Sequence, residues 1–540
     1  MRADAGRMRP RHPEGIGMIA RRIGAALAVI VALTGAPMAQ ELRIGVAEEP
    51  GALDPQYQDQ RGDAQVALHI FEALVARDTA MNLRPALAES WRALDDTTWE
   101  FKLRAGVTFH DGSAFTADDV VFTIERAAKL PNAPAPFTPH TRQIAGIEVV
   151  DPLTVRLRTA TPAPLLPVDM AAIRILSKTA ASGPAPEGKT TDALNRGEGL
   201  VGTGPYKFLE WSRGSQIVLE RNDAYWGTRP AWQRVILRLL PNATARATAL
   251  LAGEVDLVED PPTADLPALA RNERVHLAQA PTNRIIYIHL DQFAEPSPGL
   301  PMPEGRNPLK DRRVRQALLL ALDRNGLVSR VKEGYAVPAA ELLPAPMFGT
   351  TPDATVGRRD VARARQLLAE AGYPDGFVLT LAGPSGRYDH DVRVAEAVAA
   401  MWTEAGIKTQ LVLPTPAVFF RNRDEHKYSA YLSRWTAVTG EMSHVLSGLV
   451  ATPSRERGLG GGNRGRYSNP ALDAKLAEAL RSVDDDKRRA LLQEASRLVI
   501  DDAGILPLYA EVAVWAMRRG LAYAARADRL TLAQHVTAVQ

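Results

Sequence analysis

The sequence predicts an α/β protein of two lobes, with a further β-rich subdomain inserted into its N-terminal half. Before about residue 283, apolar residues alternate at period two in many segments, which is typical of strands. After that point, helical segments that end at glycine alternate with strands, which is the pattern of an α/β layer. The length of 540 residues corresponds to roughly three or four domains of ~150 residues.

The N-terminal half is expected to consist mainly of strands. Residues 41–46 alternate as a strand, and 62–75 carries helical spacing. Thr116 and Asp119 have the spacing of a capping box and predict a helix that begins there. Further strands are expected over 99–103, 107–109, 147–150, 153–157, 206–211 and 216–220.

The second half is expected to alternate helices and strands. Asp360 and Asp391 are predicted to cap helices that end at Gly372 and Gly406. A strand over 407–413 follows the second of these helices directly, because its apolar residues alternate. This order of helix, glycine and strand predicts a second α/β lobe.

The C-terminal region predicts two helices and a returning strand. Asn469 with Pro470 starts one helix, and 490–499 supports another. The unbroken alternation over 506–516 predicts a strand that pairs with an earlier sheet. We therefore expect the chain to return to its first lobe.

The chain has no cysteine and a small net charge. Without cysteine it forms no disulfide, thiolate metal site or cysteine nucleophile. The formal net charge is +3, but six of the 65 basic and two of the 62 acidic residues lie within 1–39, so the remainder carries −1. Because nucleic-acid binding needs a surplus of positive charge, we expect no nucleic-acid partner.

Residues 1–39 have the features of a secretory signal peptide. An apolar run over 23–33 follows Arg21 and Arg22 and precedes small residues up to Ala39. A membrane-spanning helix needs ~20 apolar residues, so this run is too short to be an anchor. We expect cleavage near Ala39 and an exported, soluble product.

Motifs for catalysis or metal binding are weak. The chain has ten histidines, but no H-E-x-x-H occurs, and no metal ligand is assigned. The segments 202–207 and 458–465 lack the spacing of phosphate or dinucleotide loops, and 383–386 is not a nucleophile elbow. The sequence therefore predicts a protein that is not an enzyme, with no catalytic residue, metal or cofactor.

Nine blocks of sequence resemble one family. They are 87–91 (LAESW), 99–112 (WEFKLRAGVTFHDG), 117–120 (ADDV), 202–206 (GTGPY), 221–226 (RNDAYW), 253–257 (GEVDL), 311–323 (DRRVRQALLLALD), 467–470 (YSNP) and 507–509 (PLY). In this order they are similar to the extracytoplasmic solute-binding proteins of dipeptide, oligopeptide, glutathione and nickel ABC importers, bacterial solute-binding protein family 5. The resemblance implies a periplasmic-binding-protein (clamshell) fold whose lobes close on a solute.

The resemblance also implies a function in transport. The protein would be a monomeric, periplasmic substrate-binding component that captures a short peptide or peptide-like solute. It would deliver this solute to an ABC permease and ATPase complex at the inner membrane. A nickel or other metal chelate, an opine and a sugar-like solute are alternatives within the family. A secreted hydrolase that uses the same cleft is the alternative from another class, and it would require a nucleophile and a base in contact.

One set of solute-contacting residues is implied by a Trp-x-x-Asp segment, which in peptide-binding relatives supplies an aspartate to the ammonium group of the ligand. Here the segment begins with Trp435 and Thr436, and Val438 stands in place of the acid. Thr439 and Glu441 follow in a V-T-G-acid run that resembles the glutathione-type branch. Glu441 is the candidate substitute for the missing aspartate. Ordinary core packing is the alternative for Trp435, although we favour a pocket wall.

Arg387 and Tyr388 form the second implied set. They occupy the segment that holds the ligand carboxylate in dipeptide-binding relatives. The planar fork of an arginine suits a bidentate contact with a carboxylate. An exposed loop cation is the alternative for Arg387.

The domain boundaries follow from the patterns and the resemblance together. We predict a signal peptide over 1–39, a first lobe over 40–80, 200–282 and 503–540, an inserted subdomain over 81–199, and a second lobe over 283–502.

Overall fold

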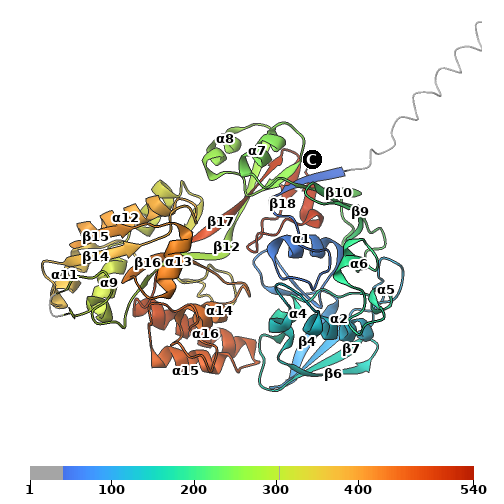
Figure 1. Cartoon of the computed structure of the whole chain (residues 1–540), viewed down its shortest axis with the longest axis horizontal. Coiled ribbons are helices and arrows are strands. Elements are labelled where there is room, and N and C mark those ends of the chain that lie inside the picture. Colours follow the sequence, from blue (N-terminus) through green and yellow to red (C-terminus); the bar gives the residue numbers. More distant parts are fainter. Residues whose placement is uncertain (1–40, 303–304, 540) are drawn as a thin grey trace, which may run out of the picture.

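Two lobes joined by a pair of long strands make up the protein (Figure 1). The computed structural model describes residues 41–302 and 305–539, so the signal peptide predicted over 1–39 lies outside the described residues. The two long strands are β12 (Val275–Leu290) and β17 (Leu506–Arg518). The two-lobed α/β fold predicted from the sequence is confirmed.

One mixed sheet of 11 strands runs through both lobes. Its strands follow the order β15-β14-β16-β12-β17-β11-β1-β10-β9-β8, and β13 pairs with β17 beside this path. Up to Pro281, β12 pairs with the second part of β17, and from Ile285 onward it pairs with the first part. The register shifts between these two residues. Such an irregularity lets a strand pair bend, and it lies where the two lobes meet.

The first lobe is built on the strands at one end of this sheet. Its strands are β1 (Glu41–Val46), β8 (Tyr206–Ser212), β9 (Gln216–Arg221), β10 (Arg234–Leu239) and β11 (Leu257–Glu259), with a small sheet of β18 (Leu521–Tyr523) and β19 (Val536–Ala538). Its helices are α1 (Arg61–Ile70), α5 (Lys178–Ala181), α6 (Thr191–Asn195), α7 (Ala243–Leu251) and α8 (Leu266–Arg271). Trp515 of β17 is buried in the same core as Ile44 of β1. The chain therefore returns to its first lobe, as predicted.

A second, four-stranded antiparallel sheet forms the β-rich subdomain. Its order is β4-β5-β7-β6. The strands are β4 (Ala88–Asp95), β5 (Thr98–Leu103), β6 (Ile144–Asp151) and β7 (Thr154–Thr159), and the nearby elements are β2 (Val75–Arg77), β3 (Leu83–Pro85), α2 (Ala117–Lys129), α3 (Thr138–Thr141) and α4 (Leu166–Met170). The capping box of Thr116 and Asp119 begins α2 as predicted. Phe101 of the sheet and Val120 of α2 share one core.

The second lobe carries helices on both faces of its part of the sheet (Figure 1). Its strands are β13 (Ala336–Pro338), β14 (Phe377–Ala382), β15 (Ile407–Val412) and β16 (Ala430–Thr436). Its longer helices are α9 (Arg312–Leu320), α11 (Val361–Glu370), α12 (Asp391–Glu404), α13 (Pro416–Asp424), α15 (Pro470–Ala479) and α16 (Asp485–Asp501). Its short helical turns are η3 (Pro308–Lys310), α10 (Arg324–Gly326), η4 (Leu327–Val331), α14 (Met442–Val445) and η5 (Leu446–Val450). Neighbouring residues of β16 belong to two different cores: Leu432 packs in the cluster of Trp402, and Tyr431 in the cluster of Leu492.

The observed helix ends test three of the boundaries predicted from the sequence. Asp360 accepts a hydrogen bond from the Arg363 N–H, and Asn469 accepts two from the first turn of α15, so both predicted caps are confirmed. The helix expected over 62–75 was predicted too long, because Phe71 already has extended backbone.

The predicted cap at Asp391 is wrong. Asp391 is the first residue of α12, and His390 precedes it in the left-handed conformation. The Asp391 carboxylate instead accepts hydrogen bonds from the backbone N–H groups of Gly386, Arg387 and Tyr388, at 3.1, 2.7 and 3.0 Å. This buried acid therefore fixes the loop before α12.

Candidate functional site

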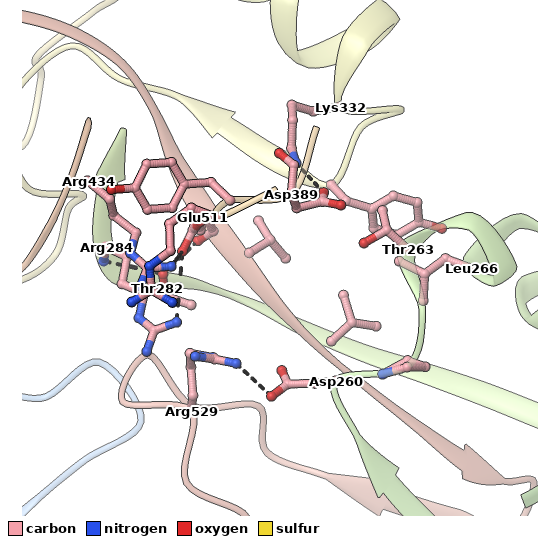
Figure 2. A pocket seen from close by; sticks show the side chains of 16 residues that line it. Asp260, Thr263, Leu266, Thr282, Arg284, Lys332, Asp389, Arg434, Glu511 and Arg529 are labelled. Atoms are coloured by element: carbon pink, nitrogen blue, oxygen red, sulfur yellow. Dashed lines mark hydrogen bonds and ion pairs between the residues drawn. The ribbon is translucent and has the colours of Figure 1, made fainter. Parts of the chain in front are cut away.

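A cavity of about 260 Å³ lies where the two lobes meet. The first lobe, the long strands and the second lobe all contribute to its walls (Figure 2). The lining residues are Asp260, Pro261, Thr263, Leu266, Thr282, Arg284, Lys332, Tyr335, Arg387, Tyr388, Asp389, Arg434, Glu511, Val512, Val514 and Arg529. A change in the relative orientation of the lobes would therefore change the shape of this cavity.

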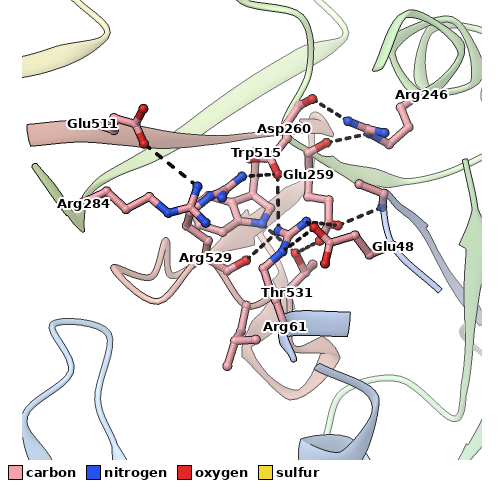
Figure 3. Close-up of polar contacts among 12 residues, drawn as sticks. Glu48, Arg61, Arg246, Glu259, Asp260, Arg284, Glu511, Trp515, Arg529 and Thr531 are labelled. Atoms are coloured by element: carbon pink, nitrogen blue, oxygen red, sulfur yellow. Dashed lines mark hydrogen bonds and ion pairs between the residues drawn. The ribbon is translucent and has the colours of Figure 1, made fainter. Parts of the chain in front are cut away.

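The first-lobe wall is held by an ion pair between Asp260 and Arg529. The Arg529 Nη2 atom lies 2.6 Å from Asp260 Oδ2, and Arg61 approaches the same oxygen at 3.3 Å (Figure 3). Arg246 adds a hydrogen bond of 2.8 Å from its guanidinium to the Asp260 carbonyl. Burial would raise the pKa of Asp260, but Arg529 and Arg61 hold it below its ordinary value.

The wall formed by the strands contains two arginines and one glutamate. Arg284 of β12 and Arg434 of β16 both approach the carboxylate of Glu511 of β17, at 3.9 and 3.5 Å. Burial lowers the pKa of Arg284 to about 9, and repulsion from Arg529 and Arg434 contributes to this shift. The surroundings of Arg284 therefore disfavour the charged form of its side chain.

The second-lobe wall is formed by the segment before α12 and by Lys332. The buried Lys332 ammonium forms an ion pair with the Asp389 carboxylate (Figure 2). Burial would raise the pKa of Asp389, but Lys332 holds it below its ordinary value. Tyr388 is buried, and the Arg434 guanidinium lies 5.1 Å from the centre of its ring. Arg387 is exposed at the cavity rim.

Five basic and three acidic side chains line the cavity. Each acid already has a basic partner: Asp260 pairs with Arg529, Asp389 with Lys332, and Glu511 with both strand arginines. Within the described part of the chain, the Arg387 guanidinium has no ion pair. The cavity therefore has an excess of positive charge and unused guanidinium donors.

Two of the site residues predicted from the sequence line the cavity. These are Arg387 and Tyr388, whose backbone is fixed by Asp391. Trp435, Thr436, Thr439 and Glu441 are not in its lining. Whether any of the six contacts a solute stays a prediction.

Trp435 points away from the cavity. Its ring packs against Gly448 and Gly462, where an added Cβ would lie 2.5 and 2.6 Å from ring atoms. Its Nε1–H donates to His444 Nδ1 at 3.2 Å. Arg434, the residue before Trp435 in β16, does line the cavity, because successive side chains of a strand point to opposite faces of the sheet.

Thr436 is the last residue of β16, and Thr439 and Glu441 follow the strand. Thr436 pairs with Arg284 in the sheet, and the Thr439 hydroxyl accepts a hydrogen bond from the Glu441 N–H at 3.3 Å. The buried Glu441 carboxylate accepts hydrogen bonds from Arg488 at 2.7 and 3.0 Å, and from Ser443 at 2.8 Å. These contacts do not favour the amine-binding role predicted for Glu441.

Five charged residues of the lining were not predicted from the sequence: Asp260, Arg284, Arg434, Glu511 and Arg529. Glu511 could have been identified from the sequence, since it is an acidic residue within the otherwise apolar interior of β17. Arg434 could also have been identified, because it directly precedes the tryptophan of the recognised segment. The others lie in segments that only the strand pairing brings together.

The described residues contain neither a candidate metal site nor a candidate membrane-spanning helix. Residues 41–302 and 305–539 contain no cluster of three or more His, Asp or Glu side chains placed to hold a metal ion. In the same ranges, no helix has both the length and the apolar character that crossing a bilayer requires.

Comparisons with known proteins agree on one family. Residues 82–455 match the family model described as "Bacterial extracellular solute-binding proteins, family 5 Middle". The chain is 29% identical to "Heme-binding protein A" of Haemophilus influenzae over 415 residues, which cover 73% of this chain and 71% of the relative. It is 30% identical to "Glutathione-binding protein GsiB" of Pectobacterium atrosepticum over 403 residues, 73% of each protein.

A solved structure agrees on the fold. The structure of HbpA2 from Haemophilus parasuis matches with a TM-score of 0.79 at 24% identity, over 93% of this chain and 100% of that one. The cavity between the lobes, the shared fold and the extent of the family match lead to one conclusion. The chain belongs to the bacterial extracellular solute-binding proteins of family 5.

Proposed function

We propose that the protein captures a short peptide or peptide-like solute between its lobes and delivers it to an ABC permease and ATPase complex at the inner membrane. The observation that carries this proposal is a cavity lined by both lobes and by the strands that join them. A solute in this position contacts both lobes at once, so it stabilises the closed state by its higher affinity for that state.

The peptide-like nature of the solute is supported by the chemistry of the walls. Guanidinium groups recognise carboxylates through paired hydrogen bonds, and every peptide with a free C-terminus carries one carboxylate. Arg387 presents such a group at the rim, and Arg284 presents another inside. One relative is named for the binding of glutathione, which is itself a tripeptide.

The protein acts in the periplasm as a monomer and releases its solute chemically unchanged. Export by the signal peptide over 1–39 places it there, and the description of the family as extracellular agrees with export. The names of its relatives describe binding rather than catalysis. Recovery of the intact solute from the purified protein by mass spectrometry tests this part of the proposal.

The central experiment measures closure. Chain 40–540 is mixed with a pool of random tripeptides, with hemin or with buffer, and small-angle scattering and thermal unfolding are recorded. We expect the peptide pool to reduce the radius of gyration and raise the unfolding temperature, because a ligand of the folded state at 100 times its Kd adds about 2.7 kcal/mol of stability. A response to hemin with none to peptides would contradict the peptide assignment. No response to either probe would contradict solute capture at this cavity.

A further inference from the structure

The cavity contains more positive charge than its own acids neutralise. Five basic and three acidic side chains line it, so the lining carries a net charge of +2. The contributors lie on three different parts of the fold. Arg529 belongs to the first lobe and Arg284 to the crossing strands (Figure 2), and Arg387 belongs to the second lobe. The excess therefore faces the cavity from opposite sides.

Two of these guanidinium groups have donors that the protein does not use. Within the described residues, the side chain of Arg284 has a single ionic contact, at 3.9 Å from Glu511, which lies beyond hydrogen-bond distance. Arg387 has no ionic contact in the same part of the chain, although its backbone is fixed by Asp391. Each guanidinium carries five N–H donors in a planar fork. The cavity thus offers two separate places for a planar anion.

No acid of the lining is left for a cationic group of the solute. Asp260, Asp389 and Glu511 are each within ion-pair distance of a basic side chain. Glu441, the acid closest in sequence to the recognised segment, is occupied by Arg488. A solute ammonium would therefore have to displace an existing ion pair, and it would meet an excess of like charge.

We infer that the solute carries at least two carboxylate groups and is recognised without its ammonium group: an acidic peptide or an N-acylated acidic peptide. This inference rests on the proposed function and narrows it to a class of solute. One carboxylate would bind at Arg387 and the other near Arg284. The cost of bringing the cations of two lobes together is then offset only by a solute with matching negative charge.

The first test uses tripeptide pools that differ in charge. Acidic, neutral and basic pools are each prepared with a free and with an acetylated N-terminus, and their effect on the unfolding temperature of chain 40–540 is measured. We expect the acidic pools to give the largest rise, and acetylation to preserve or increase it. An equal or larger rise with neutral or basic pools would overturn the inference, as would loss of the acidic response on acetylation. A lack of response to all six pools would contradict the proposed function itself, which separates the two failures.

The second test uses matched arginine variants. The affinity for the strongest single acidic tripeptide from the first test is measured by calorimetry for the unmodified protein and for Arg387→Gln, Arg284→Gln and Arg393→Gln. Arg393 is the control, because it lies on α12, is exposed and does not line the cavity. Loss of a charged hydrogen bond predicts affinities about 10- to 100-fold weaker for the first two variants. The control is expected to change affinity by less than about twofold.

The outcome is read together with the unfolding of each unliganded variant. Arg387→Gln removes an exposed side chain and is expected to unfold at the same temperature as the unmodified protein. Weaker binding at an unchanged unfolding temperature supports a direct contact with the solute. Unchanged affinity in both cavity variants, or equal losses for the cavity variants and the control, would overturn the inference.

Discussion

Arg284 provides the sharpest test of how the cavity is built. Its guanidinium lies inside the cavity, its nearest carboxylate is 3.9 Å away on Glu511, and two other arginines approach it. We predict that Arg284→Gln makes the unliganded protein more stable. A residue kept for structural reasons would give the opposite result on substitution.

The magnitude follows from the pKa of Arg284, which burial and neighbouring cations lower to about 9. The difference from the ordinary pKa of a guanidinium corresponds to ~5 kcal/mol of destabilisation of the charged form in the folded state. The substitution removes this cost, which already includes the attraction to Glu511, and adds ~1–3 kcal/mol for the partly buried amide. The expected net gain is about 2–4 kcal/mol.

The sign of the pH dependence is also fixed. Above pH 9 the folded protein releases the Arg284 proton while the unfolded chain retains it, so the unfolded state binds more protons and the stability of the unmodified protein rises with pH. The advantage of Arg284→Gln is therefore full below pH 9 and shrinks above it.

Urea unfolding of the unliganded proteins from pH 7 to 10.5 measures both effects, with Arg393→Gln as the control for loss of one positive charge. The reasoning is refuted if Arg284→Gln lowers the unfolding midpoint at pH 7. It is equally refuted if the difference between the two proteins stays constant above pH 9.

Three further predictions concern residues outside the cavity. Glu441→Gln breaks a buried ion pair and is expected to cost about 3–5 kcal/mol of stability, measured by urea unfolding. Solute affinity, measured by calorimetry, is expected to stay within about twofold. A large loss of affinity at unchanged stability would contradict this prediction. Gly462→Ala places a methyl group 2.6 Å from the Trp435 ring and is expected to lower the free energy of unfolding by about 1–3 kcal/mol. Gly461→Ala is the matched control in the same unfolding measurement, because its added methyl group meets no atom within 4 Å. Burial would lower the pKa of His140, but hydrogen bonds with two carboxylates raise it to about 9, so its contribution is full below pH 6.5 and is lost as the pH rises through 9. The stability difference between the unmodified protein and His140→Gln should thus fall by about 2–3 kcal/mol over this range, and a difference independent of pH would contradict it.

Much of the fold could be predicted because local patterns agree with the tertiary arrangement. β17 is apolar at nearly every position because it is buried on both faces along most of its length, and the capping box at Thr116 satisfies the first turn of α2. Asp391 was misassigned for a physical reason. A carboxylate at a helix start can bind N–H groups of the helix or of the preceding loop, and that of Asp391 binds three from the loop and one, of Val392, from the helix.

The site could be predicted only in part. Arg387 and Tyr388 are found because they lie in one short segment that resembles a family motif. Arg284 and Glu511 are more than 200 residues apart in the sequence, and they meet only because β12 and β17 pair side by side. No local pattern encodes that pairing. The charge balance of the cavity, which carries the inference about the solute, therefore became visible only once the strands were placed.

The same charge balance links recognition to movement. In the proposed closure, Arg387 of the second lobe would move towards the wall that carries Arg529, and the Coulomb repulsion between the two cations would grow as water leaves the space. Without a solute, this repulsion would oppose closure. A solute with two carboxylates, as inferred above, would reverse the sign of the interaction, so that closure would become favourable only when the correct charge is present. Discrimination in this cavity would then depend less on the shape of the solute than on the requirement that its charge neutralise both lobes at once.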